Sequence, residues 1–146
     1  MDLTPAKQLC IRFEGFRSKP YLCPAGVPTI GFGTTFYPDG RRVTMQDPPI
    51  TIEQAAIYLE HELKVNCLMA VLRLCPNLRD INKINALVDF VYNLGAGRLQ
   101  ISTLRRKVKD EDWDAACNEL MKWVRGGGKV LKGLVLRRQA ECLLMK

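Results

Sequence analysis

A short β-like region lies between helical patterns, and this arrangement limits the folds that the chain can adopt. Residues 19–45 hold two Gly/Pro-rich turns between short β-like segments, whereas from Thr51 onward the pattern is helical to the end. Ahead of the β-like region, Pro5 and apolar residues at helical spacing predict a short first helix that stops at Gly15. We therefore expect an α+β fold: a small antiparallel β-lobe, a larger mostly helical lobe, and a cleft between them.

The β-like region is predicted to form a small antiparallel sheet. The segments "KPYLC" and "VPTIGFGTT" flank a Pro24-Ala25-Gly26 turn, and "YPDGRRV" carries a second turn of the Asp-Gly type. Gly31 and Gly33 alternate along the second strand, which weakens it. Such glycines indicate close approach by another backbone or by a ligand.

The helical region contains three N-cap signals and two further helical patterns. Thr51 to Gln54 forms a capping box that opens a long helix ending at Pro76, and "INALVDFVYNLG" is apolar nearly all round, as a central buried helix would be. The remaining expected features are a Ser102 cap on "TLRRKV", an Asp110 or Asp112 cap on a helix to about Val124, and a last helix at about Leu131 to Leu144 after three glycines. With 146 residues and no repeat or linker, we expect one domain over 1–146, with the β-lobe at about 16–50 and the helical lobe at about 51–146 plus the first helix.

The charge and the hydropathy pattern limit where the chain can act. Its net charge is +7, which speeds encounter with polyanions such as nucleic acid, anionic membranes or anionic wall polymers, without choosing among them. No apolar run approaches the roughly 20 residues that span a bilayer, and "MDLTPAKQLCIRFEGF" is too polar for a signal-peptide core. We therefore expect synthesis in a cytoplasm and no stable membrane association.

The cysteines do not have the spacing of a metal site. There are six, with no C-x-x-C motif and a single histidine, His61, so we expect no metal, no cofactor and reduced thiols. Most of them lie in apolar helical patterns, where a free cysteine is commonly a small buried hydrophobe. Cys23 differs because it lies at the β-turn.

Three residues around this turn form the candidate site. Glu14 ends the first helix, Cys23 follows nine residues later at the turn, and Thr29 lies on the returning strand. An antiparallel return can bring these positions together in front of the helix end. A lone glutamate at a helix end is usually solvated, but at a lobe junction it is well placed for general acid catalysis.

The stretch "FEGFRSKPYLCPAGVPTIGFGTT" resembles the catalytic segment of the phage-type lysozymes, the endolysin muramidases of glycoside hydrolase family 24. That family's pattern is Glu, eight residues, Asp or Cys, five residues, Thr, which this chain matches at Glu14, Cys23 and Thr29. Two further blocks, "ALVDFVYNLGAGRLQISTLRRKV" and "WVRGGGKVLKGLVLRRQAE", resemble the family's central and C-terminal segments. The three blocks occur in the family's order, so the resemblance runs nearly end to end.

The resemblance implies hydrolysis of the β-1,4 bond between N-acetylmuramic acid and N-acetylglucosamine in bacterial peptidoglycan. Glu14 would protonate the leaving oxygen, Cys23 would hold or activate water, and Thr29 would orient that water or the sugar. As a thiolate, Cys23 could polarise water or attack the sugar; as a neutral thiol it could only help to position water. A tolerated turn residue is the alternative.

Other positions are assigned by the resemblance alone. It implies that Thr35, Tyr92, Asn93, Thr103 and Asn118 line the glycan cleft, while core packing or helix capping would also explain the last four. Thr34 stands where the family often has His, so an ion pair made by that His is lost. Arg137 and Arg138 are expected in structural ion pairs, with contact to the wall as the alternative.

Three other functions compete with a lytic endolysin. They are a basic helical module that binds nucleic acid, a peptidoglycan binder without activity, and a hydrolase that pairs Cys23 with His61. The sequence has no nucleic-acid motif, and His61 lies in the charged stretch "YLEHELK". The expected protein is thus a monomeric muramidase with no nucleic-acid partner, made in the host cytoplasm and reaching the wall after the membrane is permeabilised.

Overall fold

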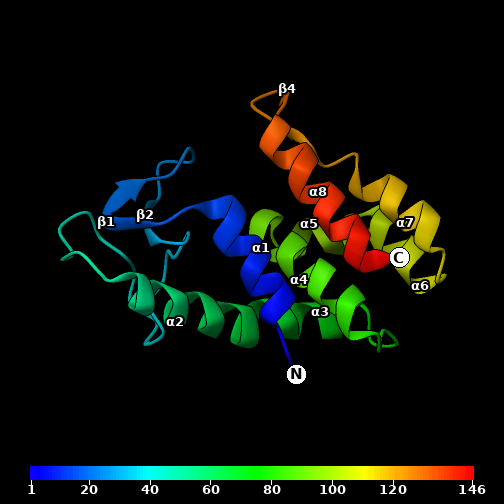
Figure 1. Cartoon of the computed structure of the whole chain (residues 1–146), viewed down its shortest axis with the longest axis horizontal. Helices are drawn as coiled ribbons and strands as arrows, with labels where there is room; N and C mark the ends of the chain where they lie inside the picture. Colours follow the sequence, from blue (N-terminus) through cyan, green and yellow to red (C-terminus); the bar gives the residue numbers. More distant parts are fainter.

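A computed structural model describes residues 1–146 and shows two lobes joined by a long helical rod (Figure 1). The predicted α+β architecture is confirmed. The elements, in chain order, are α1 (Thr4–Glu14), β1 (Arg17–Leu22), β2 (Pro28–Gly31), α2 (Ile52–Glu62), the π-helical turn η1 (Leu63–Cys67), α3 (Leu68–Leu74), α4 (Ile81–Leu94), α5 (Ala96–Ile101), α6 (Thr103–Lys109), α7 (Trp113–Leu120), β3 (Arg125–Gly126), β4 (Lys129–Val130) and α8 (Lys132–Met145). None of these helices is both long enough and apolar enough to cross a membrane.

The β-lobe is smaller than the sheet predicted over 19–45. β1 and β2 pair antiparallel, and the rest of the lobe contributes only isolated bridges, Ile30 with Thr34 and Phe36 with Arg42. The second strand ends early because Gly31 (φ +67°) leaves the extended conformation. A small core of Ile30, Tyr37 and Val43 holds the lobe together.

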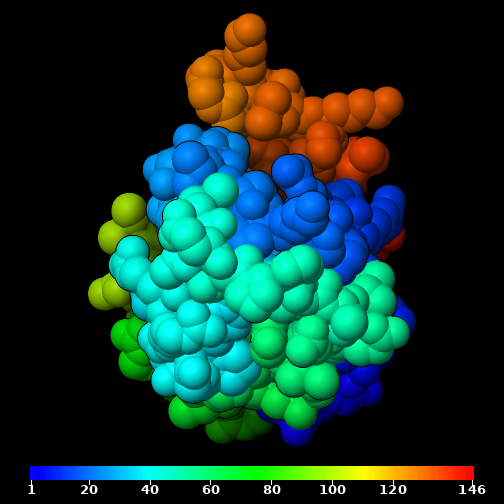
Figure 2. All heavy atoms as spheres, turned by 90° about the vertical axis from the view of Figure 1, so that its left-hand side faces the viewer, coloured from blue at the N-terminus to red at the C-terminus, as the bar shows by residue number.

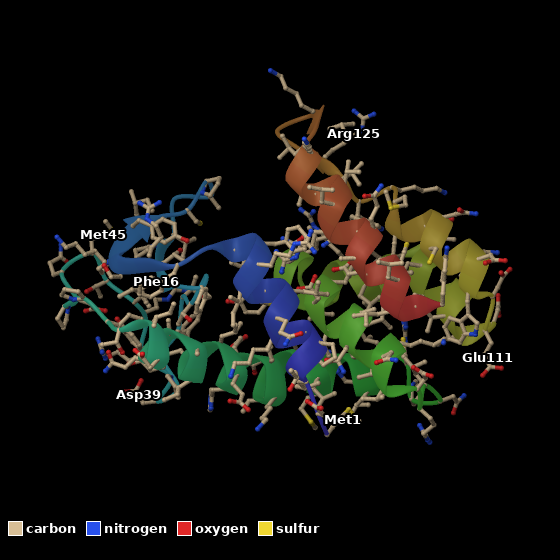
Figure 3. All side chains as sticks on the ribbon, in the orientation of Figure 1. Met1, Phe16, Asp39, Met45, Glu111 and Arg125 are labelled. Carbon is tan, nitrogen blue, oxygen red and sulfur yellow. The ribbon has the colours of Figure 1, made fainter.

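The first helix and the β-lobe meet at two aromatic rings. α1 ends at Glu14, as predicted, because Gly15 (φ +73°) turns the chain away from the helix. Phe16 follows and packs its ring on Phe32, with the ring centroids 5.6 Å apart. Figure 3 labels Phe16 where the chain enters the β-lobe. This contact fixes the β-lobe against the end of α1.

The long helix predicted from Thr51 to Pro76 is confirmed in extent and contains one irregularity. Its capping box is present: the Gln54 amide donates to Thr51 Oγ1, and the Thr51 amide donates to Gln54 Oε1. The π-helical turn η1 interrupts the rod between α2 and α3. No sequence signal indicated this turn.

The helical lobe is built around α4, which is the predicted central buried helix. α4 packs against α1 on one side and α8 on another, and the core includes Leu87, Val88 and Phe90, all fully buried. Ser102 caps α6 as predicted, by accepting from the Arg105 amide. Cys117 of α7 and Cys142 of α8 each donate a thiol hydrogen to the other's backbone carbonyl.

The region before α8 differs from the prediction. Asp112 is the cap of α7, but that helix ends at Leu120 rather than near Val124. Gly126 ends β3, and Gly127 and Gly128, which both adopt positive φ, form the turn of a β3–β4 hairpin. This hairpin stands out from the surface beyond the β-lobe in Figure 2, and Arg125 lies at its base in Figure 3.

Candidate active site

Glu14 lies at the junction of the two lobes. Its side chain is 23% exposed, and Arg137 Nη1 of α8 donates to Glu14 Oε2 at 2.6 Å. Its other oxygen faces the β-lobe: a Cβ added to Gly33 would lie 3.1 Å from Glu14 Oε1. The carboxylate is therefore held by the helical lobe through one oxygen and approached by the β-lobe at the other.

Arg137 is itself fixed by a buried carboxylate. Its Nε and Nη2 donate to the two oxygens of Asp89 at 2.9 and 2.8 Å, and the Cys10 thiol donates to Asp89 Oδ1 at 3.2 Å. Burial alone would raise the pKa of Asp89, but hydrogen bonds from Glu141 and Arg137 and the guanidinium charge lower it. The guanidinium is thus held in one orientation, as bidentate pairing with a carboxylate requires.

A second arginine of α8 holds a predicted cleft residue. Arg138 Nη2 donates to Asn93 Oδ1 at 2.7 Å and to Glu141 Oε2 at 3.1 Å. Arg137 is 3% exposed and Arg138 fully buried, so the predicted structural ion pairs are confirmed and contact of either arginine with the wall is excluded. Because Asn93 Oδ1 accepts from Arg138, its amide NH2 is the group left for a ligand.

Cys23 and Thr29 lie together at the β1–β2 turn. The turn is closed by hydrogen bonds from the Cys23 amide to Val27 O and from the Gly26 amide to Cys23 O. Hydrogen bonding from the Val27 amide, and to a smaller degree from the Ala25 amide and the Thr29 hydroxyl, lowers the pKa of the Cys23 thiol. In this structure the Thr29 hydroxyl donates to Val27 O at 2.8 Å, so it must turn to support a thiolate.

Tyr21, which pairs with Thr29 between β1 and β2, was missed by the sequence analysis. Burial raises the pKa of Tyr21, and the charges of Glu14 and then Cys23 add to the rise. Tyr21 therefore lies within electrostatic reach of both residues. The guanidinium of Arg17 lies 4.4 Å from the centre of its ring. His61 lies in the last turn of α2, and the structure shows no contact that would make a Cys23–His61 pair.

A cleft of about 360 Å³ adjoins Glu14. It is lined by the β-lobe residues 33–36, by the rod from Glu62 to Ala70, and by the end of α4 with Tyr92. Thr35 and Tyr92, two of the predicted cleft residues, therefore both line this cleft. The Tyr92 hydroxyl donates to Phe32 O at 2.6 Å, so this side chain also ties α4 to the β-lobe.

The remaining predicted residues lie apart from this cleft. Thr103, at the start of α6, lines a separate hollow together with Trp123, and Asn118 is exposed on α7. No group of three or more His, Cys, Asp or Glu side chains is arranged to hold a metal ion. Asp89 and Glu141 are functional neighbours that sequence reasoning missed. For Asp89 a signal was available: it is the single acidic residue in the apolar pattern of α4, and an acidic residue buried in this way is usually paired with a cation.

The fold and the lobe junction define the class of protein. A β-hairpin lobe, a helical lobe and a carboxylate at the end of the first helix between them are the arrangement of a lysozyme-like glycosidase. The structure is similar to that of an endolysin of Escherichia coli phage FAHEc1, with a TM-score of 0.85, 30% identity, and coverage of 99% of this chain and 93% of that one. A mutant of P22 lysozyme gives a TM-score of 0.81 at 28% identity, covering 97% and 95% of the two chains.

The sequence comparisons identify the family. The phage lysozyme family description matches residues 11–141, so the chain belongs to the phage lysozyme family. An endolysin of Acyrthosiphon pisum secondary endosymbiont phage 1 is 35% identical over 140 residues, covering 92% of this chain and 90% of that protein. A SAR-endolysin of Bacteriophage PS119 is 34% identical over 135 residues, covering 88% of this chain and 73% of the relative. The chain is thus a muramidase that degrades peptidoglycan.

Proposed function

We propose that Glu14 is the general acid that cleaves the β-1,4 bond between N-acetylmuramic acid and N-acetylglucosamine. The observation that carries this proposal is the setting of its two oxygens: Arg137 binds Oε2, while Oε1 lies against Gly33, a residue that lines the cleft. Oε1 is therefore the oxygen that can carry a proton to the substrate. Protonation of the leaving oxygen is the step that an acid at this position supplies.

Cys23 and Thr29 would act on the water. Glycoside hydrolysis by inversion needs a second group that steers water on the opposite face of the sugar. A thiol whose pKa is lowered by turn amides, next to a hydroxyl that can rotate, suits this role. Thr35, Tyr92 and Asn93 would contact the glycan near Glu14, and Thr103 and Asn118 would extend contact along the helical lobe.

The chain would work as one monomeric domain on the wall side of the host membrane. Synthesis in the host cytoplasm would be followed by passage through a permeabilised membrane. Some relatives are named SAR-endolysins, so release from a membrane is the other route to test. Expression in bacteria should lyse cells only after a membrane-permeabilising agent is added. Lysis without such an agent would contradict passage through a lesion.

The catalytic proposal is tested by Glu14→Gln. We expect the release of reducing ends from purified peptidoglycan to fall at least about 100-fold, because general acid catalysis contributes roughly 10²–10⁴. Glu53→Gln, an exposed change on α2, serves as the matched control and should retain the wild-type rate. Identification of the new reducing sugar as muramic acid or glucosamine assigns the bond. Wild-type activity in Glu14→Gln would overturn the proposal.

A further inference from the structure

Two cysteines meet between α7 and α8, and the chemistry proposed at Glu14 uses neither of them. The Cys117 thiol donates to Cys142 O at 3.6 Å, and the Cys142 thiol donates to Cys117 O at 3.5 Å. The two helices pack against each other along this side of the helical lobe (Figure 1). Because each thiol reaches the backbone of the other residue, the two side chains lie next to each other in the gap between the helices.

The two thiols also interact directly. Burial raises the pKa of the Cys142 thiol to about 12, and a hydrogen bond with the Cys117 side chain, followed by its charge, adds to the rise. A hydrogen bond between the side chains requires the two sulfurs to be neighbours. The other four cysteines are free and have no thiol partner of this kind. Cys117 and Cys142 are therefore the pair that can be joined without moving a helix.

The two sulfurs differ in how easily a reagent reaches them. Cys142 is half-buried, whereas Cys117 is 8% exposed. An external disulfide therefore meets Cys142 first, and Cys117 lies behind it, ready to react with the product. In thiol–disulfide exchange the thiolate is the attacking form. The raised pKa of Cys142 makes this first step slow at neutral pH.

We propose that Cys117 and Cys142 form a disulfide that fastens α8 to α7 after the protein leaves the reducing cytoplasm. Cytoplasmic thiols are kept reduced, whereas disulfides form and persist in the compartments outside. The bond itself needs only an oxidant. Its timing rests on the proposed function, because that function places the working enzyme on the wall side of the membrane.

The oxidant is a disulfide, carried by a small molecule or by a protein. The Cys142 thiolate attacks one of its sulfurs, forms a mixed disulfide and releases the first thiol. The Cys117 thiolate then attacks the Cys142 sulfur and releases the second thiol. The two cysteines lose two electrons and two protons in total, and the disulfide of the oxidant is reduced to two thiols.

The bond would act on the helix that holds the catalytic carboxylate. α8 carries Arg137, which donates to Glu14 Oε2, and Arg138, which donates to Asn93 Oδ1. A disulfide between positions 25 residues apart restricts the unfolded chain and so favours the folded state. The link would therefore keep α8 and its two arginines in place when the protein works outside the cell that made it.

The first test identifies the bond by its peptides. Wild-type protein is incubated with excess oxidised glutathione, alkylated, digested with trypsin and measured by mass spectrometry. We expect residues 110–122 to be joined to residues 139–146, with a mass two hydrogen atoms below the sum of the two peptides. Absence of this linked peptide, or a link between any other two cysteines, would overturn the inference.

The second test measures what the bond does to the fold. The melting temperature of oxidised wild type should exceed that of the reduced protein by roughly 5–10 °C. Cys142→Ser should show no such difference between the two conditions, whatever its own stability. Cys23→Ser, which removes the half-buried thiol of the β1–β2 turn, should keep both the linked peptide and the shift. A linked peptide with an unchanged or lower melting temperature would show that the bond does not fasten α8. Neither test involves hydrolysis, so failure of the general acid proposal would leave both results readable.

Discussion

At the scale of single residues, Cys23 occupies the position where this family has an aspartate or a cysteine. The two side chains differ in when they carry charge, because a thiol ionises several pH units above a carboxyl. In this chain the amides of the β1–β2 turn lower the pKa of the Cys23 thiol. The thiolate therefore forms at a lower pH than in an unperturbed cysteine. The lytic rate should change over the pH range in which it forms.

We predict that Cys23→Ser lowers the lytic rate more than about tenfold, because serine cannot ionise in the working range. The wild-type rate should climb with pH through the Cys23 pKa, since we propose that the thiolate is the form that activates water. Cys23→Asp should be active with a flat profile from about pH 6 to 9, because its carboxylate is already charged. Turbidity loss of a wall suspension is the measurement. A Cys23→Ser rate within a few-fold of wild type would show that the thiol is dispensable.

At the scale of elements, the β-lobe reaches its neighbours through two glycines of the second strand region. A Cβ on Gly31 would lie 3.0 Å from the Ala55 Cβ of α2, and a Cβ on Gly33 would lie 3.0 Å from the Tyr92 hydroxyl. The sequence predicted that another group approaches these glycines closely. At Gly31 this group is helix α2, and at Gly33 it is the side chains of Tyr92 and Glu14. These contacts set the width of the junction in which Glu14 lies.

We predict that Gly33→Ala and Gly40→Ala both destabilise the protein, but that only Gly33→Ala lowers activity. Both glycines have positive φ, so each substitution should cost about 1–2 kcal/mol in urea unfolding. Only Gly33 lies against Glu14; Gly40 has nothing within 4 Å of an added Cβ. A shift of a few tenths of an ångström at Glu14 should lower kcat roughly tenfold in Gly33→Ala alone. Equal hydrolysis rates in the two variants would show that this contact does not position Glu14.

At the scale of the whole molecule, a buried charge cluster joins α1, α4 and α8. Two guanidinium groups, Arg137 and Arg138, face three carboxyl groups, those of Glu14, Asp89 and Glu141. Burial first, and then the hydrogen bond to Asp89 and its charge, raise the pKa of Glu141 well above its usual range. With a proton on Glu141, the cluster would hold two negative charges against two positive ones.

We predict that Glu141→Gln flattens the pH dependence of stability. A carboxyl whose folded pKa is raised contributes stability that is fully present below the unfolded value near 4.3 and is lost as pH rises toward the folded pKa. Glutamine mimics the protonated form and does not titrate. As pH rises from about 5 to 8, the unfolding free energy of wild type should therefore fall relative to that of Glu141→Gln. Asp89, whose pKa is lowered, acts only on the acid side of this interval.

The control for this experiment is Glu119→Gln, which removes a pair with Lys122, whose side chain is 69% exposed. Exposed pairs contribute little, so the curve of this variant should run parallel to wild type within about 0.5 kcal/mol. Parallel curves for Glu141→Gln and wild type would show that Glu141 is ionised at neutral pH in the folded protein.

Much of the architecture could be predicted because its signals are local. The capping box at Thr51, the Ser102 cap and the glycine stop after Glu14 each depend on residues a few positions apart, and all three are present. The apolar pattern of α4 likewise identified the central helix. The β3–β4 hairpin was missed because three consecutive glycines signal only a break, and the pairing across them depends on where α8 packs.

The sequence by itself determined the order of helices and turns, the α+β class and the spacing of Glu14, Cys23 and Thr29. These follow from backbone preferences and from a family pattern along the chain. Only the tertiary structure decided that Arg137 holds Glu14, that Arg138 orients Asn93, and that η1 turns Glu62 and Asn66 toward the cleft. The reason is physical: the paired residues lie as many as 123 positions apart, and burial in a shared core fixes which charges meet.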